Sequence, residues 1–219
     1  AQKATLALAA ATGTELPRAA EVAGSTLRGF GIDAKDTGRV TDVMALSFSK
    51  SALDMEKFAE SMKFVAPIAK SAGFSIEGTT AMIAQLADVG IHGSLAGTSL
   101  KNIFLKLADS SSALSKALGG PVTNMAELQP KLLELKESGL DLGGALELTD
   151  KRSAAAFLTL VEGADSLDTL KESFDNAGGA AERMAKVQLD TLEGRVTIMN
   201  SALEGLGIRL FDMVEGPLN

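Results

Sequence analysis

The chain has 219 residues, of which 46% are hydrophobic and only 4% aromatic, with nine Phe and neither Trp nor Tyr. A core built mainly of Ala, Leu, Val, Ile and Met favours packed helices over sheets, which prefer β-branched and aromatic residues. The absence of Cys excludes disulfides, thiolate metal sites and Cys nucleophiles. The net charge of −7 and the scarcity of aromatic rings argue against direct nucleic-acid binding, which needs a basic surface and stacking platforms.

Apolar residues recur at three- and four-residue spacings along most of the chain, and no segment alternates as a strand does. We therefore predict an all-α fold, a multi-helix domain of αα-hairpins with a long C-terminal helix. Capping residues mark several helix starts, among them Asp33, Ser51, Ser75, and the capping box of Asn124 with Glu127. The predicted helices cover residues 3–11, 17–29, 34–48, 52–71, 76–89, 95–108, 125–138, 142–147, 150–162, 166–176 and 179–214.

A weak internal repeat relates residues 31–45 to residues 73–87, at an offset of 42 residues. Gly31 aligns with Gly73, and a helix-capping residue follows each glycine two positions later. Each copy therefore predicts an αα-hairpin made of a helix, a glycine turn and a capped helix. Chance similarity between two ordinary helix starts is the alternative.

The stretch LADVGIHGSLAGTSL, residues 86–100, concentrates glycines before a predicted helix. Such a stretch either cradles a phosphate or forms a tight joint between two packed helices. The phosphate-binding loop needs a Lys before its Ser or Thr and a preceding strand, and both are missing here. We therefore expect Gly90 to end one helix in a left-handed conformation and Gly93 and Gly97 to allow close backbone approach. Thr98 and its neighbour are expected to hydrogen-bond nearby backbone groups.

No catalytic constellation emerges from the polar residues. His92 is the only histidine, and a single imidazole makes a zinc site only if carboxylates converge on it. The acidic residues are scattered, and the DSLD motif at 165–168 is better placed as a helix start than as a carboxylate pair. We predict no catalytic, cofactor-binding or metal-binding residues.

The end of the chain carries a heptad pattern of apolar residues over about four heptads. We expect a compact helical core over residues 1–178 and a long heptad-patterned helix over 179–219 that leads into a longer parent chain. This helix either lies on its own domain or begins a coiled coil through which copies self-associate. The residues of the predicted seam are Leu189, Leu192, Val196, Met199, Leu203, Leu206 and Leu210.

Three segments, residues 11–48, 51–108 and 139–194, resemble the core region of phage tail tape measure proteins. The most specific pieces are FAESMKFVAP, LADVGIHGSLAGTSL and NAGGAAERMA. The resemblance implies a long helical virion protein inside the tail tube whose length sets tail length and which scaffolds tube assembly. It implies tail tube protein and tail assembly chaperones as partners, and a location in the tail lumen, with assembly in the host cytoplasm. Prophage-derived relatives fit equally well, and no catalytic residue is carried over.

Two other functions compete with this interpretation. A membrane-active helical protein would act during genome ejection through amphipathic helices, although an acidic chain suits anionic lipid poorly and no apolar run approaches the ~20 residues of a spanning helix. A cell-wall-cleaving enzyme would need a catalytic group that the sequence does not offer. The proline and glycine joints indicate a compact shape, so we expect an assembly or docking module within a ruler.

Overall fold

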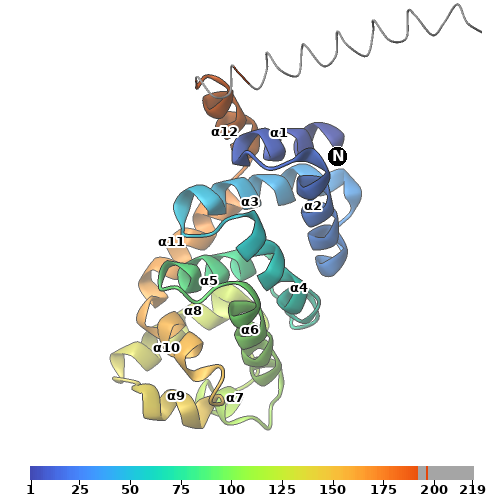
Figure 1. Cartoon of the computed structure of the whole chain (residues 1–219). Coiled ribbons are helices and arrows are strands. Elements are labelled where there is room, and N and C mark those ends of the chain that lie inside the picture. The colour runs from blue at the N-terminus through green and yellow to red at the C-terminus, as the bar shows by residue number, and fades with distance from the viewer. Residues whose placement is uncertain (192–195, 197–219) are drawn as a thin grey trace, which may run out of the picture.

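The computed structural model describes residues 1–191 and 196, and within this part all regular structure is helical (Figure 1). The all-α prediction is therefore confirmed. The helices are α1 (Gln2–Thr12), α2 (Leu16–Phe30), the short 3-10 helix η1 (Ala34–Asp36), α3 (Thr37–Lys50), α4 (Met55–Ser71), α5 (Ile76–Asp88), α6 (Gly93–Ala108), α7 (Ala113–Ala117), α8 (Met125–Glu137), α9 (Leu142–Leu148), α10 (Ala154–Glu162), α11 (Ala164–Asp175) and α12 (Ala180–Leu189).

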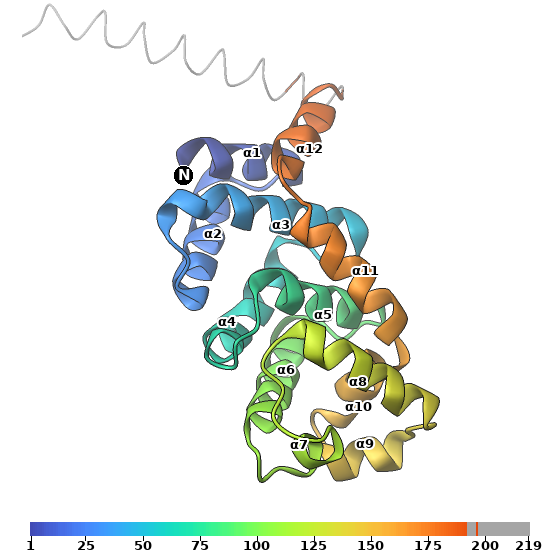
Figure 2. The same cartoon turned by 180° about the vertical axis from the view of Figure 1, so that it is seen from behind.

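The helices stack in two layers along one direction (Figures 1 and 2). In one layer α4 packs between α2 and α6, and its contact with α6 is the most extensive in the described part of the chain. In the other layer α5 packs between α3 and α11. Helices α1 and α12 contact each other at one end of the stack, whereas α7 and α9 lie at the opposite end. The first and last described helices therefore meet at the same end.

The same turn ends α2, α4 and α5. In each case a glycine with positive φ follows the helix, and the N–H of the apolar residue after it donates to a carbonyl five residues earlier, at 2.9 Å. This left-handed turn satisfies carbonyls that the helix end leaves free, and glycine adopts it at little cost. The glycines are Gly31 (φ 62°), Gly73 (φ 88°) and Gly90 (φ 85°). The first two belong to the hairpins that the offset of 42 residues predicts.

Helix α5 occupies the centre of the core. All of its residues from Ile76 to Ala87 are buried, whereas its neighbours each keep an exposed face. Its N-terminal cap is Ser75, whose hydroxyl accepts the N–H of Gly78 at 3.1 Å. Because α5 is surrounded on all sides, its long polar side chains reach neighbouring helices: Glu77 binds Arg39 on α3, and Gln85 binds the Thr159 carbonyl on α10.

Two helix starts test the predicted caps. The cap at Asn124 is confirmed, since its side chain accepts the Glu127 N–H at 2.9 Å, but the Glu127 carboxylate accepts the N–H of Thr123, at 3.1 Å, and not that of Asn124. The cap predicted at Ser51 is wrong: α4 is capped by Asp54, whose carboxylate accepts the N–H of Lys57 at 2.8 Å. Both residue types cap helices well, and the apolar pattern starts too close to both to choose between them. The short helix α7 was not predicted, because five residues are too few to show a helical period.

The helix predicted over 179–214 is interrupted within its described part. Helix α12 ends at Leu189, and Asp190 and Thr191 lie outside any helix. Both residue types have low helix propensity, which accounts for the break. Among the predicted seam residues, Leu189 is half-buried and Val196 is 45% exposed. The remaining seam positions lie outside the described residues: Leu192, Met199, Leu203, Leu206 and Leu210.

Candidate functional site

The glycines of the 86–100 stretch serve two different needs. Gly90 follows α5 with φ 85°, and Gly93 begins α6 with φ 60°, so both hold conformations that L side chains rarely adopt. Gly97 is needed for space. A Cβ there would lie 3.0 Å from the Cα of Ser61 and closer still to the Ser61 carbonyl oxygen. The backbones of α4 and α6 therefore touch at this crossing.

Hydroxyl groups tie this crossing to its surroundings. The Ser61 hydroxyl lies 2.8 Å from the Lys57 carbonyl and 2.9 Å from the Gly93 carbonyl, which links α4 to the first turn of α6. Thr98 is half-buried, and beside it the Ser99 hydroxyl donates to the Arg152 carbonyl at 3.2 Å. The stretch thus connects three parts of the stack.

A second close crossing was missed in the sequence. A Cβ at Gly29 would lie 2.8 Å from the Ala66 Cβ, so α2 approaches α4 as closely as its side chains allow. A glycine inside a helix costs about 1 kcal/mol relative to Ala, and Gly29 is such a residue. This unfavourable residue inside a helix was the sequence signal that could have indicated the close crossing. Helix α4 is consequently held between two glycine contacts, one on α2 and one on α6.

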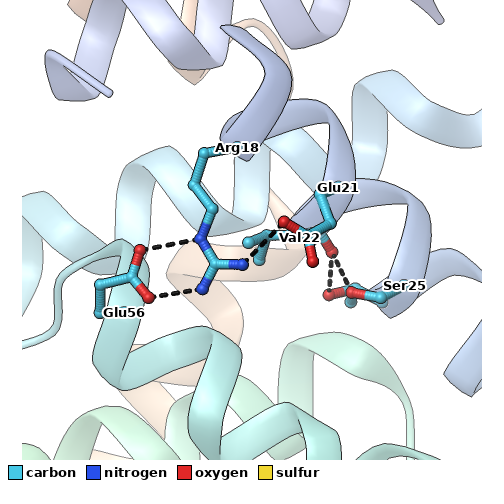
Figure 3. A network of polar contacts seen from close by, with 6 residues as sticks. Arg18, Glu21, Val22, Ser25 and Glu56 are labelled. Atoms are coloured by element: carbon cyan, nitrogen blue, oxygen red, sulfur yellow. Dashed lines mark hydrogen bonds and ion pairs between the residues drawn. The ribbon is translucent and has the colours of Figure 1, made fainter. Parts of the chain in front are cut away.

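Two arginine–glutamate pairs each join neighbouring helices within a layer, at the same sequence separation of 38 residues. Arg18 on α2 binds Glu56 on α4 through both carboxylate oxygens, with Nε 2.9 Å from Oε1 (Figure 3). Arg39 on α3 binds Glu77 on α5 in the same manner, at 2.6 Å and 2.8 Å. Each pair joins one helix to the next helix of its own layer.

The two pairs differ in burial. Glu56 is exposed, and its hydrogen bond with Arg18 lowers the pKa of its carboxyl group and raises that of the guanidinium. The Glu77 side chain is only 5% exposed. Burial by itself raises the pKa of Glu77, but hydrogen bonds from Arg39 and the adjacent backbone outweigh it, and the net pKa is lowered. Glu77 is therefore a buried carboxylate that keeps its charge because Arg39 is bound to it.

Beside this pair, Asp42 on α3 holds the start of α12. Its two carboxylate oxygens accept the backbone N–H groups of Gly179 and Ala181, at 2.8 Å and 2.9 Å. Asp42, Arg39 and Glu77 line one small cavity of about 140 Å³. No sequence signal connects residues so far apart, and this contact was not predicted.

Three features of the described residues bear on other functions: metal ligands, cavities and membrane-spanning helices. His92 is exposed at the start of α6, and within residues 1–191 and 196 no three His, Asp or Glu side chains group as metal ligands. A cavity of about 410 Å³ lies between α2 and α4, and its rim holds Arg18, already bound to Glu56 and Glu21. None of the described helices is long and apolar enough to cross a membrane. The ion pairs and the hydrogen bonds at the helix crossings described above join helices to one another.

Comparison with known proteins gives a consistent result. The model of the phage-related minor tail protein family matches residues 1–163. The tape measure protein of Pneumococcus phage Dp-1 is 32% identical over 227 aligned residues, which cover 97% of this chain and 20% of that protein. The probable tape measure protein of Escherichia phage P2 is 30% identical over 206 residues, covering 86% of this chain and 25% of that protein. That of Clostridium phage phiCD119 is 22% identical over 222 residues, covering 94% and 24%.

No solved structure matches the chain. The chain spans about a fifth to a quarter of the length of the curated relatives it matches. The predicted resemblance is confirmed, since the family match covers more than half of the chain and the relatives match nearly all of it. This chain belongs to the phage-related minor tail protein family.

Proposed function

We propose that this chain is the folded helical module of a tail tape measure protein, with an assembly or docking role inside a longer molecular ruler. The observation that carries the proposal is the similarity to a tape measure protein over 97% of the chain. The helical stack agrees with it, because its polar groups form joints and caps rather than a reactive centre. Residues 1–178 would form the compact core, and residues 179–219 would lead toward the rest of the parent protein.

The ruler itself would be the helical remainder of the parent. An α-helix rises about 1.5 Å per residue, so the number of helical residues translates directly into length. In this stack the first and last described helices meet at one end. It therefore adds much less length to the parent protein than a single helix of the same number of residues would. Such a compact module suits docking better than measuring.

The partners follow from the same proposal. In assembly the parent would contact tail tube protein and tail assembly chaperones, first in the host cytoplasm and then in the tail lumen. Copies would self-associate through the segment after Gly179, where the heptad pattern lies. Direct nucleic-acid binding is not part of the proposal, since the chain is acidic.

The deciding experiment is tail length measured by electron microscopy. Deleting about 70 residues of predicted helix elsewhere in the parent gene should shorten tails by roughly 100 Å, at about 1.5 Å per residue. The control replaces those residues with an unrelated helical sequence of equal length and should leave tail length unchanged. Tails of unchanged length after the deletion would refute the ruler.

A structural rather than catalytic role is part of the proposal. The purified chain should produce no clearing in a peptidoglycan zymogram, with a lysozyme lane as the positive control. A cleared band at 22.6 kDa would contradict it.

A further inference from the structure

Helix α12 is capped by a residue from another helix. Its own N-terminal position is Gly179, which has no side chain to offer and lies at φ 74°. The cap comes from Asp42 on α3, whose carboxylate accepts the N–H groups of Gly179 and Ala181 across 137 and 139 residues of sequence. In the other capped helices with a side-chain bond, the acceptor is the residue directly before the helix, as Asp54 is for α4. Asp42 therefore fastens one helix to another.

Helix α12 contacts α1 over an extensive surface, with Met184 half-buried against the core, but its fully buried side chains are small. The buried residues of α12 are three alanines, Ala180, Ala181 and Ala185. Val187 is 70% exposed, and the ion pair from Lys3 on α1 to Glu182 joins two side chains that are 87% and 59% exposed. Exposed pairs of this kind contribute little, and small side chains remove little apolar area from water. The Asp42 cap thus adds a specific polar attachment to a contact made mostly by small or partly exposed side chains.

The connection before α12 is suited to act as a hinge. A Cβ at Gly178 would meet no atom within 4 Å, and Gly179 has a left-handed backbone. The Arg183 guanidinium of α12 donates to the Gly178 carbonyl at 2.8 Å, so this bond joins α12 to the connection itself and not to another helix. The hinge lies directly beside the Asp42 carboxylate.

We propose that α12 is a latch, closed by Asp42 and hinged at Gly178 and Gly179, which opens as a unit while the helices around α5 stay folded. Opening breaks the two Asp42 hydrogen bonds and the contacts of α12 with α1 and α3, and it leaves the Arg39–Glu77 pair intact. Elements with few buried apolar contacts open at lower free energy than the core of the same protein. While the latch is closed, the orientation of α12 relative to the stack is fixed. When it opens, α12 can change that orientation.

The unmodified chain provides the first test, by hydrogen exchange and mass spectrometry at increasing, sub-denaturing urea. The amides of α12 should exchange through a local opening that precedes the opening of α5. Exchange of α12 and α5 in one common transition would overturn the proposal, because α12 would then be an integral part of the core.

The second test compares Asp42→Ala with Asp54→Ala, a control that removes the cap of α4 and none of the hydrogen bonds of α12. Loss of a cap predicts that exchange from α12 rises roughly fivefold to thirtyfold in Asp42→Ala, with α5 unchanged. Asp54→Ala should leave α12 at its original rate. An equal rise in α5, or no rise in α12, would overturn the latch, and the measurement on the unmodified chain decides the question if Asp42→Ala fails to fold.

Discussion

Gly97 lies against the backbone of Ser61, where a Cβ at position 97 would come within 3.0 Å of the Ser61 Cα. Backbone atoms cannot move aside as a flexible side chain can. Gly97→Val should therefore force α6 away from α4 and destabilise the fold by about 1–3 kcal/mol or more. For a chain of this size, that predicts a fall in Tm of roughly 2–12 °C in a thermal melt.

A matched control for this substitution is Gly38→Ala in α3, where an added Cβ would meet no atom within 4 Å. Replacing an unobstructed helical glycine by Ala favours the helix by about 0.5–1 kcal/mol, so Gly38→Ala should melt at or above the original temperature. If Gly97→Val melts within about 1 °C of the unmodified chain, the close joint does not exist. Gly93→Val should also destabilise, but through its positive φ rather than through crowding.

The two arginine–glutamate pairs give a comparison within one molecule. Glu77→Gln weakens a pair whose carboxylate is buried and leaves Arg39 with a neutral partner, which should cost about 1–3 kcal/mol. Glu56→Gln removes the same charge from an exposed pair, where the cost should be at most about 1 kcal/mol. Urea denaturation at pH 7 measures both. Equal losses would mean that burial does not distinguish the pairs.

The lowered pKa of Glu77 also predicts how stability depends on pH. The carboxyl group of an unfolded Glu titrates near pH ~4.3, and in the folded chain the Glu77 pKa is lower. The folded state thus binds a proton less readily, so the contribution of Glu77 is fully present above that pH and is lost as the pH falls through the folded value. The difference in unfolding free energy between the unmodified chain and Glu77→Gln should be constant from about pH 5 to 8, at about its pH 7 value, and shrink below about pH 4. A difference that grows on acidification would contradict the assignment.

The local features of this fold were predictable from sequence because their causes are local. The glycine turns at Gly31 and Gly73 and the Asn124 cap each depend on residues within a few positions of one another. The cap predicted at Ser51 was wrong because Asp54, three residues later, is an equally good capping type. The break after Leu189 lies in two residues of weak helix propensity within an otherwise strong heptad pattern.

The contacts between distant residues could not be predicted in the same way. Nothing in the sequence near Arg39 or Asp42 indicates Glu77 or Gly179, since their proximity results from how α3, α5 and α12 stack. A single sequence shows residue propensities and the spacing of apolar residues, but it does not show which residues of two packed helices lie opposite each other. Gly97 was predicted to allow close approach, but its contact with Ser61 became visible only with the helices in place.

The corner between α10 and α11 carries the last prediction. It lies at Gly163, and a Cβ there would come 2.7 Å from Cδ of the buried Gln85 side chain, whose amide donates to the Thr159 carbonyl at 2.8 Å. Gly163→Ala should displace that amide and cost about 1–3 kcal/mol in urea denaturation. Gln85→Ala should also destabilise, because it removes the hydrogen bond and leaves the Thr159 carbonyl without that donor.

The two changes address one contact, so their costs should not add. In the double variant the methyl group added at position 163 would enter space that the Gln85 amide has left, which predicts a coupling of about 0.5–3 kcal/mol in favour of the double variant. Combining Gln85→Ala with Gly38→Ala gives the control, since those sites share no partner and their effects should add within about 0.5 kcal/mol. Additive losses for Gly163 and Gln85 would show that the corner forms without the glutamine. The predicted coupling would instead mean that the central helix, through one amide, determines where the chain turns back along the stack.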